Sequence, residues 1–341
     1  MNDAEQNAPD QLVVLTGAAG RLGPATHQAL LDAGLKVRAV DWVGTSSSTL
    51  PVLKANLFHP ATCRKMLQGA TTLVHLAYRR EPYGYANGYP ARTFDDHIRL
   101  NRIAFQTACE VGIRRIIFSS SIQVIAPQLP KLSATQLPVY LPLDDQLPPL
   151  PDNWYALAKR CSEEMLGMLH RIHGIDTTVF RFPALVHGAP VINPWWFEPR
   201  TSEGMSYLTY LDAANVLAKA AQSRIPGQRT YLPASRRNGT GKPVEQLIRE
   251  SFPGVPLRKP VSEMEGLVDI SRVVSELGWE PLELSRPEAP ADKLPPRERI
   301  RVALKMLTPY RLRKLVLKPF PAELKTKVKN RLKAMITLRR K

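Results

Sequence analysis

The feature that most constrains the fold is a glycine-rich segment, TGAAGRLG at residues 16–23, which follows a short apolar run and opens a helical pattern. The apolar run, Leu12–Thr16, predicts a strand, and the helical pattern continues to about Ala33. Such glycines let the backbone turn tightly and approach a pyrophosphate, while the helix N-terminus supplies N–H donors. Glycines also serve ordinary turns, but this strand–loop–helix context favours a dinucleotide site. We expect its contacts to be Gly17, Gly20, Arg21, Leu22 and Gly23.

Strands and helices are expected to alternate along the rest of the chain. Helical patterns separate four further strand candidates, which are Lys36–Asp41, Thr72–Ala77, Ile116–Ser119 and Thr177–Phe182. Strands that alternate with helices form parallel sheets with helices on both faces. The sequence therefore predicts an α/β protein built on a Rossmann-type, doubly wound parallel sheet.

Three parts are expected along the 341 residues. Residues 1–185 form the dinucleotide-binding domain, whose sheet can recruit later segments. Residues 186–292 form a smaller substrate-binding region, in which Trp195 and Trp196 either stack on a sugar face or pack as core or lid. A proline-rich linker then leads into a basic helical tail at residues 293–341.

The net charge of +17 is concentrated in this tail. Residues 293–341 contain 17 Lys and Arg but only two acidic residues, so they carry +15 and leave the body nearly neutral. Apolar residues form one helical stripe among the basic ones, at Leu324, Val328, Leu332, Met335 and Ile336. A basic amphipathic helix suits the surface of an anionic membrane, although the same stripe can pack on the body or on a partner subunit. Nucleic acid is a poorer match, because the tail lacks interleaved aromatic residues.

The rest of the composition predicts a cytoplasmic protein, peripheral at the inner face of a membrane if the tail binds there. No apolar run approaches the roughly 18 residues of a membrane span, and the acidic N-terminus does not resemble a signal peptide. Cys63, Cys109 and Cys161 have no metal-ligand spacing, so we expect neither a metal nor a disulfide framework.

The acid that ends the second predicted strand bears on cofactor choice. Asp41 lies 24 residues after Gly17, where a carboxylate can accept hydrogen bonds from the adenosine ribose and repel a 2′-phosphate. No basic residue follows it directly, which favours NAD over NADP. Arg21 is the competing feature, because a loop arginine can bind a 2′-phosphate.

A second motif supplies candidate catalytic groups. Tyr155 and Lys159 form YxxxK, so on a helix their side chains share one face. A phenol is a poor base at neutral pH, and an adjacent ammonium stabilises its phenolate form. Ser119–Ser121, at the end of a predicted strand, can place a hydroxyl beside a substrate oxygen.

The order of these features resembles the extended short-chain dehydrogenase/reductase family, the group of NAD-dependent epimerases, dehydratases and sugar dehydrogenases. The resemblance covers about residues 12–281. The motifs that carry it are TGAAGRLG, Asp41, VHLA at 74–77, IIFSSS at 116–121, YALAK at 155–159, Arg181–Pro183, Tyr207–Val216 with Asp212, and VDISRVVSELGWEP at 268–281.

The resemblance implies a role for each matching position. Tyr155 would be the general acid/base, Lys159 would hold the nicotinamide ribose, and Ser121 would bind the reacting oxygen. Ser119 and Ser120 would be strand-end structure or cofactor contacts. The remaining implied NAD contacts are Asn56 and Leu57 beside the adenine, Leu76 and Ala77 in the VHLA segment, Ser119, and Pro183 near the nicotinamide carboxamide.

At three places the sequence departs from the family pattern, and these departures restrict which of the family's functions the resemblance implies. The family's usual helical Asn aligns with His97, and Asn101 is a nearby alternative. Ala184 stands near the place of an Asn that contacts substrate phosphates in sugar-nucleotide epimerases. Ile122 and Gln123 replace the acidic pair of 4,6-dehydratases, and neither can act as the acid or base that water elimination needs.

The predicted reaction is hydride transfer between NAD and a carbinol carbon of a sugar or sugar-nucleotide substrate. Net oxidation and transient oxidation, as in a 4-epimerase, suit the same residues. The alternatives are reduction of a non-sugar carbonyl and a non-catalytic, dinucleotide-binding sensor or scaffold. The sequence leaves the oligomeric state open, with a homodimer as one alternative.

Overall fold

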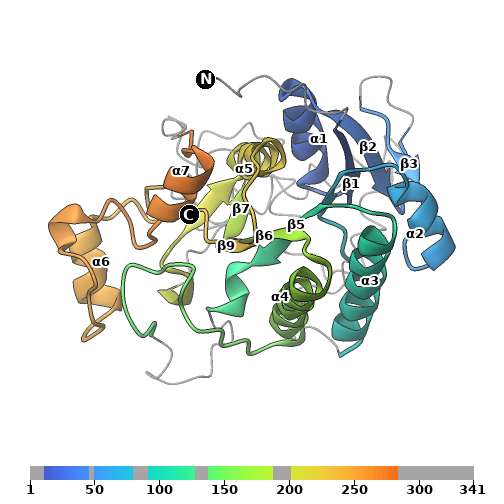
Figure 1. The fold of residues 1–341 in the computed structure, drawn as a ribbon. Helices are drawn as coiled ribbons and strands as arrows, with labels where there is room; N and C mark the ends of the chain where they lie inside the picture. The colour runs from blue at the N-terminus through green and yellow to red at the C-terminus, as the bar shows by residue number, and fades with distance from the viewer. Residues whose placement is uncertain (1–10, 46–49, 80–90, 127–136, 187–200, 283–341) are drawn as a thin grey trace, which may run out of the picture. The chain divides into compact units, whose positions relative to one another are not determined.

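The first strand shows how the sequence builds a layered fold. Its apolar residues alternate between two cores, because successive side chains of a strand point to opposite faces of the sheet. Val13 and Leu15 pack into one cluster, whereas Val14 packs into the other. A strand that is buried on both faces requires helices on both sides, which is the arrangement in Figure 1.

The structure is a computed structural model that describes residues 11–45, 50–79, 91–126, 137–186 and 201–282. These residues all fall within one contact unit, Met1–Glu288. Trp195, Trp196 and the predicted basic tail lie outside the described residues.

Within the described residues, seven strands form one parallel sheet in the order β3-β2-β1-β4-β5-β6-β9. The strands are β1 (Leu12–Thr16), β2 (Lys36–Asp41), β3 (Leu53–Lys54), β4 (Thr72–His75), β5 (Arg115–Ser121), β6 (Asp176–Phe182) and β9 (Gln228–Tyr231). The chain runs outward from β1 to β3 and then returns to the other side of β1. The order therefore reverses between β1 and β4, which is where ligands bind in doubly wound sheets.

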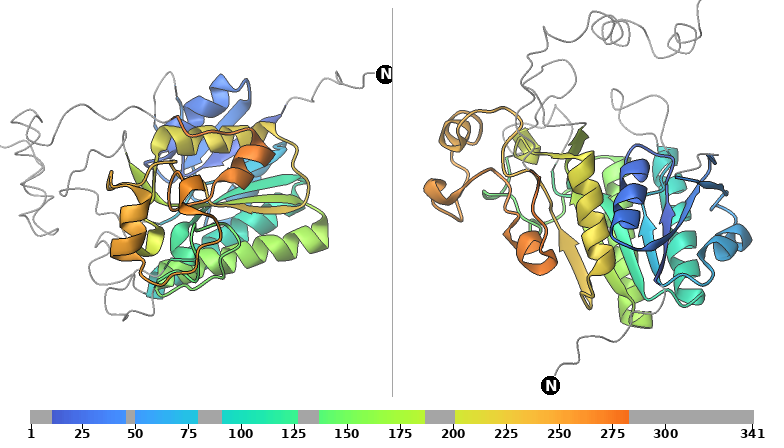
Figure 2. Two further views of the ribbon diagram at one scale, coloured as in Figure 1. Left: turned by 90° about the vertical axis from the view of Figure 1, so that its left-hand side faces the viewer. Right: turned by 90° about the horizontal axis from the view of Figure 1, so that it is seen from above.

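The helices divide between the two faces. Helices α1 (Gly23–Asp32) and α5 (Tyr210–Gln222) pack together on one face, while α2 (Pro60–Leu67), α3 (Ala91–Glu110) and α4 (Trp154–His173) cover the other. Figure 2 shows these two layers with the sheet between them. The doubly wound fold is thereby confirmed. Both α5 and β9 lie beyond residue 185 in the sequence; β9 forms an edge of this sheet, and α5 packs beside α1.

Outside the sheet, the smaller elements either pack against the first apolar cluster or form a third cluster. Strands β7 (Ala184–Val186) and β8 (Tyr207–Thr209) pair in parallel, and helices α6 (Val244–Ser251) and α7 (Ser271–Leu277) follow. The cluster unites the turn after β5 with the proline-rich segment at 137–147 and with α6. Within the part of the chain that is described, no helix is long and apolar enough to cross a bilayer.

Candidate active site

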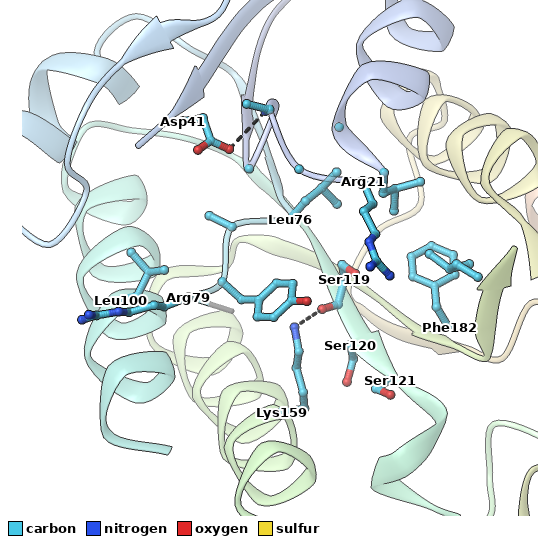
Figure 3. A pocket seen from close by; sticks show the side chains of 18 of the residues that line it. Arg21, Asp41, Leu76, Arg79, Leu100, Ser119, Ser120, Ser121, Lys159 and Phe182 are labelled. Carbon is cyan, nitrogen blue, oxygen red and sulfur yellow. Dashed lines mark hydrogen bonds between the residues drawn. The ribbon is translucent and has the colours of Figure 1, made fainter. Parts of the chain in front are cut away.

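One large cavity lies along the carboxyl ends of the parallel strands, at the point where the strand order reverses. Its volume is about 1210 Å³. Every residue that the sequence predicted as a cofactor contact or catalytic group lines it (Figure 3): Gly17, Gly20, Arg21, Leu22, Gly23, Asp41, Asn56, Leu57, Leu76, Ala77, Ser119, Ser121, Tyr155, Lys159 and Pro183. The sheet therefore gathers segments from seven parts of the chain around a single cavity.

The glycine loop leaves no room for side chains. A Cβ atom on Gly17, whose φ is +74°, would lie 2.7 Å from the backbone nitrogen of Ala77. A Cβ on Gly23 would lie 2.2 Å from the carbonyl oxygen of Ala18. The first turn of α1 has no side-chain cap, so its backbone N–H groups remain available to an anion. These features suit the pyrophosphate of a dinucleotide.

Asp41 is held in place at the end of β2 by two backbone N–H groups. Its Oδ2 accepts a hydrogen bond from Ala19 at 3.1 Å, and its Oδ1 accepts one from Val43 at 3.1 Å. In Figure 3, Arg21 extends from the other side of the glycine loop, away from Asp41 and toward Phe182. This placement disfavours Arg21 as a ligand for a 2′-phosphate near Asp41.

We expect Asp41→Ala to weaken NAD binding about tenfold and to narrow the preference for NAD over NADP. The carboxylate supplies charged acceptors to ribose hydroxyls, which are worth roughly 1.5–3 kcal/mol in proteins. Titration of both cofactors against the native protein and the variant measures the effect. Asp32→Ala, at an exposed helical carboxylate, is the matched control. A native preference for NADP would overturn the assignment.

The three serines at the end of β5 have different partners. The backbone oxygen of Ser119 accepts a hydrogen bond from Lys159 Nζ at 2.5 Å. The hydroxyl of Ser120 donates a hydrogen bond to Glu163 Oε1 at 2.6 Å. The same carboxylate forms a buried ion pair with Arg181. The hydroxyl oxygen of Ser121 accepts from the backbone N–H of Gln123 at 3.3 Å, which leaves the Ser121 hydrogen available to a ligand.

Lys159 lies in an unusually apolar place for a cation. Its ammonium is 4.6 Å from the ring centroid of Phe118 and 5.7 Å from that of Tyr155, and the residue is only 4% exposed. Burial lowers the pKa of Lys159 to about 7, and the nearby Glu163 opposes this shift. When protonated, this ammonium favours the phenolate form of Tyr155.

The structure separates the two candidates for the family's helical Asn. His97 packs edge-on against Tyr155 and Tyr78, with ring centroids 5.6 and 5.4 Å away. Neither of its ring nitrogens has a hydrogen-bond partner of acceptable geometry among the described residues. Burial, followed by the charge of Lys159, lowers the pKa of His97 to about 3. His97 is therefore a neutral side chain behind Tyr155.

Asn101 belongs instead to a buried chain of hydrogen bonds. Its Oδ1 lies 3.0 Å from His75 Nε2, and its Nδ2 donates to Ser162 Oγ at 2.7 Å. Because Asn101 Oδ1 can only accept, the Nε2 nitrogen of His75 carries the proton. In the neutral ring, Nδ1 then accepts a hydrogen bond from the hydroxyl of Thr16 at 2.8 Å. Burial lowers the pKa of His75 to about 4, consistent with a neutral ring. The chain connects the residue before the glycine loop to the helix that carries Tyr155 and Lys159.

Some cavity residues were not predicted from the sequence. Tyr78 follows the VHLA segment directly, and Tyr210 begins α5 within Tyr207–Val216, a segment that resembles the family. Glu203, from the short helix at Thr201–Glu203, also lines the cavity and has no sequence motif of its own. In the described residues, no three His, Cys, Asp or Glu side chains are grouped as a metal site would require.

The fold and the cavity together define a Rossmann-type, NAD-binding protein. A profile described as "NAD dependent epimerase/dehydratase family" matches residues 13–188, more than half of the chain. The chain belongs to this family, and its cofactor is NAD.

Individual relatives are more distant. An NAD-dependent glucose-6-phosphate dehydrogenase from Haloferax volcanii is 26% identical over 197 residues, covering 53% of this chain and 71% of the relative. Uronate dehydrogenase from Agrobacterium tumefaciens has a TM-score of 0.56 and 18% identity, covering 92% of both chains. The Thermus thermophilus UDP-glucose 4-epimerase complex with NAD has a TM-score of 0.56 and 15% identity, covering 88% of this chain and 99% of that one. These structures share the fold with this chain.

Proposed function

We propose that the protein transfers hydride between NAD and a carbinol carbon of a sugar-like substrate, with Tyr155 as acid/base. The observation that carries this proposal is the convergence of Ser121, Tyr155 and Lys159 on the cavity that also contains the glycine loop. A dinucleotide-binding sensor would need the loop but not these three groups together.

The cavity residues suit NAD in an extended arrangement. The uncapped start of α1 would hold the pyrophosphate, and Asp41 would accept hydrogen bonds from the adenosine ribose. Asn56 and Leu57 would lie at the adenine, and Lys159 would reach the nicotinamide ribose. When bound, NAD supplies the acceptor or donor of the hydride.

Each catalytic side chain then has one task. The phenolate of Tyr155 accepts the proton of the substrate hydroxyl as the carbon becomes a carbonyl. Ser121 donates a hydrogen bond to the same oxygen and keeps it near Tyr155. The Lys159 ammonium stabilises the phenolate before the transfer. In an epimerisation, Tyr155 returns the proton to that oxygen after the carbonyl has been reduced on its other face.

A substrate screen tests the proposal. NADH formation would be followed with glucose, glucose 6-phosphate, glucuronate and UDP-glucose, and the UDP-sugar products would be analysed for epimers. Turnover of any of these supports a sugar-directed reaction, and its type separates dehydrogenase from epimerase. A 4-keto-6-deoxy product should be absent, because Ile122 and Gln123 offer no acid or base. NAD binding without turnover of any sugar would favour the sensor, or a reductase of non-sugar carbonyls.

The basic tail carries a separate proposal, binding to an anionic membrane surface, which rests on its sequence alone. Each basic residue near such a surface contributes roughly 1 kcal/mol, so partial engagement of the tail would suffice. Co-sedimentation with anionic and neutral liposomes, at low and high salt, would compare the full chain with a chain ending at Ala291. We expect salt-sensitive binding to anionic liposomes by the full chain only. Equal sedimentation of the two proteins, or unfolding of the shortened one, would assign the tail to structure.

A further inference from the structure

Gln123 is a cavity-lining residue whose side-chain amide points in a determined direction. We infer that Gln123 donates a hydrogen bond to a substrate oxygen adjacent to the reacting carbinol, and that Asn153 fixes this polarity. The inference deepens the proposed function and depends on it, since it names what the same site recognises: an acceptor oxygen, such as a hydroxyl, carbonyl or carboxylate, next to the oxidised carbon.

The direction of the Asn153 amide is set by the catalytic helix. Asn153 is the N-cap of α4, and its Oδ1 accepts a hydrogen bond from the backbone N–H of Ala156 at 2.9 Å. The cap requires an acceptor, so the oxygen cannot exchange places with the nitrogen without losing this bond. The Nδ2 group therefore faces away from the helix, where it donates to Asp152 Oδ1 at 2.9 Å and to Gln123 Oε1 at 3.3 Å.

The Asn153 donor in turn fixes Gln123. With its Oε1 accepting from Asn153, the side chain of Gln123 presents its Nε2 hydrogens elsewhere. This nitrogen has no hydrogen-bond partner among the described residues. Unlike the fully buried unpaired atoms of the structure, it keeps some accessible surface. Gln123 as a whole is 8% exposed and lines the cavity. Gln123 thus offers an N–H donor pair whose direction is set by Asn153, and the residue lines the cavity.

The same turn carries both Gln123 and Ser121, the residue that would bind the reacting oxygen. Gln123 lies in the short helix η2 (Ile122–Val124) directly after β5, and its backbone N–H donates to Ser121 Oγ. Ser121 and Gln123 therefore offer two hydrogen-bond donors from one rigid turn. A substrate that satisfies both carries oxygens on neighbouring carbons, as a sugar does. An apolar or cationic substituent there would leave the amide unpaired, which is costly in a desolvated site.

Variants of Gln123 and Asn153 test the inference on whichever sugar the screen identifies. Gln123→Leu should lower kcat/KM about tenfold to hundredfold, the cost of losing one buried hydrogen bond. Asn153→Asp keeps the acceptor that caps α4 but removes the donor, so the Gln123 amide should reverse and kcat/KM should fall similarly. In both variants the affinity for NAD should be unchanged. Gln106→Leu, at an exposed glutamine of α3, is the matched control.

Two comparisons separate this role from a general effect on structure. A deoxy analogue that lacks the adjacent oxygen should be a poor substrate for the native protein, yet Gln123→Leu should not worsen it further. Asn153→Asp should lower kcat/KM little further when Gln123→Leu is already present. If the two substitutions instead disturbed the structure independently, their fold-reductions in kcat/KM would multiply in the double variant. If the Asn153→Asp variant fails to fold, Asn153→Ser is used in its place, because serine also offers an oxygen that can cap the helix. Native turnover with kcat/KM unchanged in Gln123→Leu contradicts this inference alone, while an absence of native turnover contradicts the proposed function.

Discussion

Replacement of Tyr155 by Phe should reduce kcat about 10²–10⁴-fold on the identified substrate, the usual contribution of general acid/base catalysis. The variant removes one oxygen, the atom that would accept the substrate proton, and keeps the ring that packs against His97. NAD affinity and the midpoint of thermal unfolding should therefore stay close to native values. Steady-state kinetics and NAD titration measure the two effects separately.

Tyr78→Phe is the discriminating control for this prediction. Tyr78 also lines the cavity, and its ring centroid lies 5.9 Å from Lys159 Nζ, against 5.7 Å for Tyr155. Proximity to the ammonium therefore does not by itself decide which phenol reacts. Because Tyr155 shares a helical face with Lys159, we expect Tyr78→Phe to retain most activity. A large loss of kcat in Tyr78→Phe with a small loss in Tyr155→Phe would assign the acid/base role to Tyr78 instead of Tyr155.

The fold could be predicted because its signals are local. The glycine segment directly follows a strand and opens a helix, and the strands alternate with helices along the chain, so the order of elements specifies the sheet. The structure extends two of the predicted strands by one or two residues at an end: β5 runs from Arg115 to Ser121, and β6 begins at Asp176. The predicted strand at Thr72–Ala77 instead ends at His75, and Leu76 and Ala77 lie against Gly17 of the glycine loop.

The meeting of the candidate site residues at one cavity could be predicted for a related reason. Functional residues at the carboxyl ends of parallel strands meet at one edge of the sheet, so their approximate position follows from topology. Helical spacing could not decide between His97 and Asn101, since residues four apart on α3 share one face. Packing shows how the surroundings of the two residues differ. His97 packs against Tyr155, whereas Asn101 makes hydrogen bonds with His75 and Ser162. The amide direction of Gln123 likewise depends on a cap 30 residues away.

The buried histidines predict a strong dependence of stability on pH. His75 and His97 are neutral in the folded protein, with pKa values lowered to about 4 and about 3 from the ordinary 6.5. As pH falls below 6.5, the unfolded chain binds protons at these positions and the folded protein does not. The lowered pKa values therefore favour the folded state above pH 6.5, and this stability is lost as pH falls toward 4. Each histidine contributes about 1.4 kcal/mol per pH unit within this window.

Between pH 6 and pH 5 the two histidines together should reduce the free energy of unfolding by roughly 2–3 kcal/mol, a large part of a typical stability. Denaturant unfolding at a series of pH values measures this slope. His97→Asn removes one titrating ring and should remove about half of the slope that these two histidines contribute. His75→Gln should do the same, even if each variant is less stable overall. His173→Asn, at an exposed histidine near the end of α4, should leave the slope unchanged. Equal slopes in the native protein and in His97→Asn would show that the imidazole behind Tyr155 becomes charged without unfolding, and the neutral state assigned to it at the site would then be wrong.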